Sequence, residues 1–233
     1  MCAAKKCDSS LCGYLSDYLE DAGRSGVTEL LRSKPARKRS RAQIEKQLAN
    51  LARQVAACTK CQELVANRTN TVFGVGNPEA DLVFLGEGPG AEEDRQGIPF
   101  VGRSGQLLTD IITKGMKLTR DEVYICNIVR CRPPGNRTPL PEEAANCWPF
   151  LQATLEAIAP KYICCLGSTA ATHLLKTGEA IGKLRGRVLD YNGAQVVCTY
   201  HPSYLLRNPP AKKQTWEDIQ LLMKIMDTAK NHA

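Results

Sequence analysis

The stretch Asp81-Leu82-Val83-Phe84-Leu85-Gly86-Glu87-Gly88-Pro89-Gly90 decides the fold of this 233-residue chain. A short apolar run that ends in a glycine-rich turn is typical of a buried strand followed by a sharp loop. The turn lacks the lysine of a P-loop and the spacing of a dinucleotide-binding fingerprint, and the acidic residues 92–94 that follow would repel a phosphate. The turn is therefore either a plain connection from strand to helix, or a place where backbone amides and a carboxylate meet a small ligand.

Three further apolar runs predict buried strands, and segments with helical periodicity separate them. This alternation indicates an α/β fold: a three-layer sandwich with a central, mostly parallel sheet of four strands, covered on both faces. Ligands of such sheets bind beyond the carboxyl ends of the strands, so we expect residues 86–94, 127–137 and 201–207 to form one site. The other expected strands are 123–129, 162–167 and 196–200, and the expected helices are 42–57, 104–116 (with Ser104 as N-cap), 141–159, 168–176 and 213–230.

Four of the eleven cysteines form two spaced pairs, C-x2-C and C-x15-C. Zinc ribbons typically use two C-x2-C knuckles, so the wide second pair suits a cluster with four cysteine ligands better. The spacing favours an iron–sulfur cluster and leaves zinc as the alternative. The paired residues are Cys58, Cys61, Cys131 and Cys147; Cys126, Cys164, Cys165 and Cys198 are expected in the core, and Cys2, Cys7 and Cys12 have no assignment.

Composition and charge set the broad class of the protein. The chain is 43% hydrophobic and 24% charged, with a net charge of +7, which suits a polyanionic partner without establishing one. The start lacks the apolar segment of a secretory signal, and no segment is long enough to span a bilayer, so we expect a cytoplasmic protein with reduced cysteines. Five positive charges in residues 34–41 indicate a solvated linker, with a DNA-binding arm as the alternative. We predict an appendage and linker over 1–41, with a short helix within 1–33, and one domain over 42–233.

Five separated motifs resemble, in their order, those of the family 4 uracil-DNA glycosylases. The resemblance covers residues 45–228, and the paired cysteines match that family's cluster ligands. It implies a monomeric DNA-repair enzyme with a structural [4Fe-4S] cluster. The expected reaction is hydrolysis of the N-glycosidic bond of deoxyuridine in single- or double-stranded DNA, which releases uracil and leaves an abasic site. The motifs are 86–94, 97–102, Asn127, 131–139 and 201–203.

The resemblance also implies which residues form the uracil pocket. An enzyme that acts on a base must rotate it out of the duplex, and Phe100 is expected to stack on the rotated ring. Asn127 would pair with the uracil edge, since an amide both donates and accepts hydrogen bonds. Gly86, Glu87 and Gly88 would complete the wall. The alternatives for Phe100 and Asn127 are a core aromatic and a cap at the strand end.

The resemblance assigns the chemical step to His201, Glu93 and Glu87. His201 would donate a hydrogen bond to uracil O2, where negative charge develops as the bond breaks. Family 1 enzymes carry an aspartate for the attacking water, but Gly88 stands at the corresponding position. We therefore expect Glu93 to hold the water and Glu87 to shape the turn and the wall that faces uracil.

The residues after the histidine suit contact with DNA. Apolar side chains can fill the gap that a rotated base leaves, and arginines can contact phosphates. The alternative is a surface loop with incidental leucines. The expected DNA-binding residues are Arg132, Arg137, Tyr204, Leu205, Leu206 and Arg207.

Other functions are alternatives to a family 4 uracil-DNA glycosylase. One is a glycosylase like those of family 5, with a broader range of bases; that group usually has an apolar residue where Glu87 stands. Another is a non-catalytic iron–sulfur protein that binds nucleic acid. A small electron carrier is disfavoured, because the paired cysteines suffice for one cluster only.

Overall fold

The computed structural model describes residues 39–230, and the chain from Ser40 onward forms one compact unit. Its centre is a six-stranded sheet with the order β1-β3-β2-β4-β6-β5. The four central strands are parallel, and the two edge strands pair antiparallel to their neighbours. The strands are β1 (Val75–Gly76), β2 (Leu82–Gly86), β3 (Tyr124–Asn127), β4 (Tyr162–Leu166), β5 (Val188–Tyr191) and β6 (Ala194–Thr199).

The four predicted strands are the four central strands, and the predicted number of strands is corrected from four to six. The edge strands β1 and β5 escaped prediction because neither carries a buried apolar run. β1 has two residues, and the side chains of β5 alternate between exposed and half-buried positions. Short, half-exposed strands of this kind are common at the edge of a sheet.

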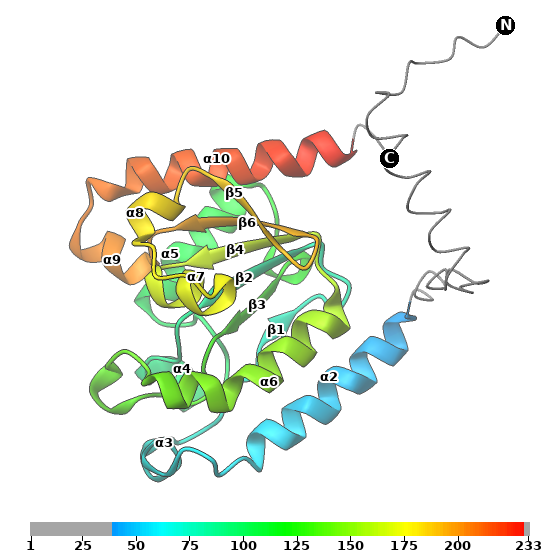
Figure 1. Ribbon diagram of the computed structural model, residues 1–233, viewed down its shortest axis with the longest axis vertical. Helices are drawn as coiled ribbons and strands as arrows, with labels where there is room; N and C mark the ends of the chain where they lie inside the picture. Colours follow the sequence, from blue (N-terminus) through cyan, green and yellow to red (C-terminus); the bar gives the residue numbers. More distant parts are fainter. Residues whose placement is uncertain (1–38, 231–233) are drawn as a thin grey trace, which may run out of the picture. The chain divides into compact units, whose positions relative to one another are not determined.

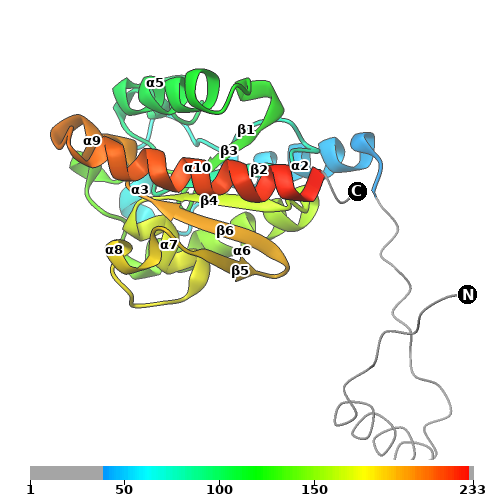
Figure 2. The same cartoon turned by 90° about the horizontal axis from the view of Figure 1, so that it is seen from above.

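Helices cover both faces of the sheet, which confirms the mostly parallel α/β sandwich (Figures 1 and 2). Side chains of a strand point alternately to the two faces: in β2, Val83 and Leu85 pack into one core, and Leu82 and Phe84 into the other. The first core includes residues of α2, α6, α7 and α8, and the second includes residues of α5, η1 and α10. The helices are α2 (Arg41–Ala56), α3 (Gln62–Asn67), α4 (Ala91–Gln96), α5 (Arg103–Asp110), η1 (Ile111–Gly115), η2 (Arg120–Glu122), η3 (Pro134–Asn136), α6 (Pro141–Ile158), α7 (Ser168–Leu175), α8 (Ile181–Leu184), α9 (Pro202–Arg207) and α10 (Ala211–Lys230).

The helix predicted for 104–116 differs in its start and its regularity. Gly102, with extended backbone, is the N-cap, so Ser104 lies in the first turn of α5 and its predicted role as cap is wrong. The helix also changes to a π turn at Ile111–Gly115. The segment 201–207, expected as a loop, contains the short helix α9.

Cys126, Cys164, Cys165 and Cys198 are fully buried, as expected for core residues. No helix between residues 39 and 230 is both long and apolar enough to cross a bilayer. The predicted appendage helix, most of the linker, and Cys2, Cys7 and Cys12 lie outside the described residues. The boundary at residue 41 stays a prediction.

Candidate functional site

Two strand ends and one loop meet at the carboxyl edge of the sheet. Gly86 ends β2 and is in register with Asn127, which ends β3. A Cβ atom on Gly86 would lie 2.4 Å from Asn127 Oδ1 and 2.6 Å from Phe100 Cζ. Glycine is therefore the residue that leaves room here, and the structure places these three predicted pocket residues side by side. Gly88 follows, and a Cβ atom there would meet Val129 Cγ2 at 2.8 Å.

Asn127 carries an unsatisfied acceptor at this point. Its side chain is 1% exposed, and Oδ1 is buried with no hydrogen-bond partner among the described residues. An unpaired buried amide oxygen costs about 1–3 kcal/mol, and a native structure that retains one needs a reason. A ligand with an N–H donor beside Gly86 and Phe100 would satisfy Oδ1.

Phe100 is held in a strained backbone conformation. Its φ angle of 55° lies in the left-handed region, where a bulky residue is an outlier. Arg120 donates to the carbonyl of Phe100 at 3.2 Å and to that of Pro99 at 2.9 Å. The amides of residues 101 and 102 both donate to Glu93 Oε1 at 2.9 Å. The loop is therefore fixed on both sides of the aromatic ring.

Glu93 joins this loop to the glycine-rich turn. Its Oε2 accepts the N–H of Gly90 at 3.1 Å, so the carboxylate binds three backbone amides in all. A carboxylate offers about four acceptor sites, which leaves one for a water molecule or a ligand. The sequence predicted Glu93 for the site but gave no sign of this bridging contact.

His201 lies beside Phe100 as a neutral hydrogen-bond donor, with 5.7 Å between the two ring centroids. The backbone N–H of Ser203 donates to Nδ1 at 3.1 Å. Because that amide can only donate, Nδ1 is the acceptor and the neutral ring carries its proton on Nε2. Burial, together with the charge of Arg207, lowers the pKa of His201 to about 4, against a smaller opposing effect of Glu93. The ring is therefore uncharged at neutral pH.

Glu87 is bound to a helix. Its Oε2 accepts a hydrogen bond from Thr169 Oγ1, in α7, at 2.5 Å. Its backbone carbonyl accepts the N–H of Val129. These contacts suit the predicted role of Glu87 in shaping the turn.

The four paired cysteines gather near α3 and the start of α6, and their thiols influence one another. Cys131 interacts electrostatically with Cys58 and Cys61, and Cys147 with Cys131 and Cys61. Burial raises the pKa of Cys147 to about 11. Between residues 39 and 230, no three His, Cys, Asp or Glu side chains form a group that could hold a metal ion as they stand.

Hydrogen-bond donors nevertheless point at three of these sulfur atoms. Arg68 Nη1 lies 3.0 Å from Cys131 Sγ, and Asn146 Nδ2 lies 3.6 Å from Cys61 Sγ. The backbone N–H of Arg130 donates to Cys147. Burial is the larger effect and raises the pKa of Cys61, Cys131 and Cys147, whereas these donors lower it and so favour the thiolate, the form in which cysteine binds metals.

The predicted DNA-binding residues differ in their exposure to solvent. Tyr204 and Leu206 are exposed, at 38% and 37%, whereas Leu205 is 1% exposed and packs inside the protein. Arg207 is exposed at the end of α9. Leu206 is therefore the leucine of this pair that can reach a bound molecule.

The two arginines of the loop 131–139 have intramolecular partners. Arg137 binds Glu143 through two hydrogen bonds and Glu63 through a third. Arg132 donates from Nε to Asn136 Oδ1 at 2.7 Å and keeps its other nitrogens for further partners. Arg137 therefore ties α3 to the start of α6, and Arg132 is the freer of the two.

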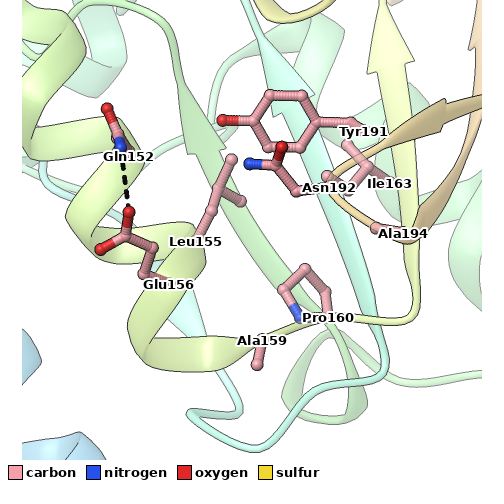
Figure 3. A pocket seen from close by; sticks show the side chains of 9 residues that line it. All are labelled: Gln152, Leu155, Glu156, Ala159, Pro160, Ile163, Tyr191, Asn192 and Ala194. Carbon is pink, nitrogen blue, oxygen red and sulfur yellow. Dashed lines mark hydrogen bonds between the residues drawn. The ribbon is translucent and has the colours of Figure 1, made fainter. Parts of the chain in front are cut away.

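A separate cavity of about 170 Å³ lies at the other end of the sheet, where β4 and β6 begin (Figure 3). Its carboxylate, Glu156, accepts a hydrogen bond from Gln152 at 2.9 Å. The remaining lining is mostly apolar, with Leu155 and Ile163 among the residues drawn. We assign the chemistry to the carboxyl edge, where the polar side chains converge.

Substitution of Gly105 tests the packing that holds Phe100. A Cβ atom at Gly105 would lie 2.0 Å from the backbone of Phe100, whereas one at Gly182 would meet nothing within 4 Å. We expect Gly105→Ala to lower the free energy of unfolding by about 1–3 kcal/mol, because overpacking forces the backbone to move. Urea unfolding measures this, with Gly182→Ala as control. Equal stability of the two variants would contradict the strained contact.

Comparisons with known proteins agree with this geometry. Residues 73–220, which carry every residue of the carboxyl-edge site, match the Uracil DNA glycosylase superfamily. The chain is 50% identical to the Type-4 uracil-DNA glycosylase of Thermotoga maritima over 160 residues, 68% of this chain and 82% of the relative. It is 39% identical to that of Archaeoglobus fulgidus over 181 residues, 74% of this chain and 90% of the relative. The chain belongs to the type-4 uracil-DNA glycosylases, as the sequence motifs predicted. A Type-5 uracil-DNA glycosylase of Pyrobaculum aerophilum is 30% identical over 179 residues, 64% of this chain and 79% of the relative.

Proposed function

We propose that this uracil-DNA glycosylase rotates deoxyuridine out of DNA into the space between Phe100, Asn127 and His201. Hydrolysis of the N-glycosidic bond there releases uracil and leaves an abasic site for base excision repair. Membership in the type-4 family supports the activity, and the geometry of the site supports the roles of the residues. Phe100, fixed by Arg120 and Glu93, provides a rigid surface on which the base stacks.

The observation that supports uracil as the base is the unpaired Oδ1 of Asn127. Uracil presents N3–H as donor and O4 as acceptor, so an amide can accept from the first and donate to the second. In the same orientation, cytosine would place its N3 acceptor against Oδ1 and its amino group against Nδ2. A site that leaves buried polar groups unpaired with the wrong base discriminates strongly against it.

His201 and Glu93 act on the two sides of the reaction. Nε2–H of His201 donates to uracil O2 as the electron pair of the glycosidic bond passes to the ring. Glu93 uses its remaining acceptor site to orient the water that attacks C1′ of the sugar, and Glu87 shapes the wall of the pocket. A neutral histidine suits this role, because its donor needs no proton from solvent.

Cys58, Cys61, Cys131 and Cys147 would hold a [4Fe-4S] cluster, whose contribution is structural: it would tie the end of α2 and α3 to the start of α6. The hydrogen bonds toward their sulfur atoms fit such a group. Iron and sulfide analysis of anaerobically purified protein tests this, and stoichiometric zinc without iron would overturn it.

DNA contact is assigned to the exposed face around α9. Leu206 fills the gap left by the rotated base, with Tyr204 beside it. Arg207 and Arg132 contact phosphates. Arg137 supports the loop through its hydrogen bonds to Glu143, and its Nη2, which also donates to Glu63, stays near the surface. Leu205, being buried, anchors α9 beneath this face. We further propose that the enzyme acts as a monomer.

Arg207→Ala tests the phosphate contact. We expect weaker binding to a uracil-containing oligonucleotide, and a slope of log K against log salt that is shallower by about one unit for one lost contact. The single-turnover rate at saturating enzyme should change little. Lys161→Ala, which removes one positive charge before β4 at the opposite end of the sheet, is the control. Identical salt slopes for the two variants would contradict the contact.

Release of free uracil from a defined oligonucleotide by the purified protein tests the function as a whole. Matched substrates with cytosine, hypoxanthine or xanthine in the same position separate a uracil-specific enzyme from one with a broader range of bases. Binding without release would indicate the non-catalytic alternative.

A further inference from the structure

Arg130 is a buried cation without a visible counterion. Its side chain is fully buried, three residues after the end of β3. One nitrogen donates to the carbonyl of Phe73, and another lies 3.4 Å from Thr154 Oγ1. The guanidinium also stacks on the Phe73 ring at 5.2 Å, and Nε has no partner. Among the ion pairs between residues 39 and 230, none involves Arg130.

An uncompensated charge in a protein interior is expensive, and buried charges are normally paired or bound to a metal site. Arg185 follows this rule: its side chain is 16% exposed and is paired with Asp218 at 3.1 Å. Arg130 has carbonyl and hydroxyl oxygens and the Cys126 thiol as partners. Burial raises the pKa of that thiol, so these partners satisfy hydrogen bonds but do not neutralise the charge of Arg130. Among the described residues, therefore, no negative group balances the charge of Arg130.

The neighbours of Arg130 show where that group belongs. Arg130 precedes Cys131, its backbone N–H donates to Cys147, and its charge acts on the Cys147 thiol. Arg68 also contacts the paired cysteines. Its Nη1 lies 3.0 Å from Cys131 Sγ, and its Nη2 lies 2.9 Å from the carbonyl of Cys58. Arg68 is likewise in none of the ion pairs of the described region.

We propose that Arg130, assisted by Arg68, supplies the positive charge that balances the iron–sulfur cluster and sets its reduction potential. This inference rests on the cluster proposed above. Four thiolates give a [4Fe-4S] centre a net negative charge, and nearby charges and hydrogen bonds to the sulfurs tune its potential. A cation favours the more negative, reduced state, so Arg130 raises the potential and protects the cluster from oxidation.

Replacement of the charge in the intact holoenzyme tests this role. Arg130→Met keeps an unbranched apolar side chain, and we expect at least a tenfold shift of the one-electron equilibrium toward the oxidised side, equivalent to 59 mV. Faster bleaching of the visible absorption by ferricyanide should accompany this shift. Arg130→Lys restores a charge and should recover part of both changes. Arg185→Met is the matched control, because it removes an arginine whose hydrogen bonds and ion pairs involve none of the four paired cysteines.

The measured potentials distinguish three cases: the proposal is supported, the proposal is overturned, or the cluster itself is absent. A potential that falls with Arg130→Met, recovers with Arg130→Lys and stays constant with Arg185→Met supports the proposal. Equal potentials and bleaching rates in all holoproteins overturn it. If Arg130→Met does not fold, Arg68→Met and Arg130→Lys decide, since Arg68 is half-exposed and unchanged potentials in both would overturn the proposal. Parent protein without iron and sulfide would instead refute the cluster itself, while uracil release tests the glycosylase activity independently.

Discussion

We expect His201→Ala to slow single-turnover release of uracil by about 10²–10³-fold, the usual effect of losing one donor to a developing oxyanion. DNA affinity should change little, because the half-buried ring lies beside Phe100 rather than on the exposed face of α9. Rapid-quench measurements at saturating enzyme give the rate, and fluorescence anisotropy gives the affinity. A variant dominated by lost affinity would make His201 an anchor of α9, whose first turn it caps, and not a donor to the leaving group.

His173→Ala is the matched control, since it removes a histidine of α7 that the site does not use. The pH dependence provides a second readout. Because the pKa of His201 is lowered to about 4, its neutral form persists through neutral pH, and the rate should show no histidine titration between about pH 5 and pH 8. The same pKa shift affects the folding stability. Above pH 6.5, the ordinary pKa of histidine, the stabilising contribution of neutral His201 is complete. As the pH falls toward 4, the unfolded chain binds a proton that the folded chain excludes, and this contribution is lost.

The central sheet was predictable because burial imposes a simple pattern. Each of the four parallel strands is covered on both faces, so each reads as a continuous apolar run. The runs that begin at Leu82 and Tyr162 are examples. The edge strand β5 has water on one side and alternates without a strong apolar signal, so it was missed. The N-cap at Gly102 was missed because a tertiary contact with Glu93 determines it.

The site residues could be predicted only where a local sequence pattern marks them. Gly86 and Asn127 end apolar strands, and parallel strands bring their carboxyl ends to one edge. His201 follows a third strand in the same way. Arg120, Thr169 and Arg130 carry no such signal, because their roles depend on which backbone carbonyls, carboxylates or thiols the fold places beside them. The order of residues in the chain cannot show that Arg130 lacks a counterion.

Asn127→Asp should lower uracil excision by at least about 10²-fold, because a site built to pair with polar atoms rejects mismatched partners strongly. The substitution exchanges Nδ2, the proposed donor to O4, for an oxygen. The ionised carboxylate cannot donate to O4 and repels it, which lowers uracil excision. Burial raises the pKa of such a carboxyl, and its protonated fraction can donate to cytosine N3 and accept from the cytosine amino group. We therefore expect measurable, slow release of cytosine, which the parent enzyme lacks.

The experiment compares single-turnover rates on matched oligonucleotides that carry uracil or cytosine. Asn192→Asp, at an exposed turn between β5 and β6, controls for the added acidic group. Loss of uracil excision in Asn127→Asp without loss of folding, alongside a normal rate in Asn192→Asp, would show that the side-chain amide of Asn127 reads the base. Unchanged kinetics on uracil would remove Asn127 from the pocket. Its buried oxygen would then be a packing defect, and the choice of base would have to come from the wall formed by Gly86 and Phe100.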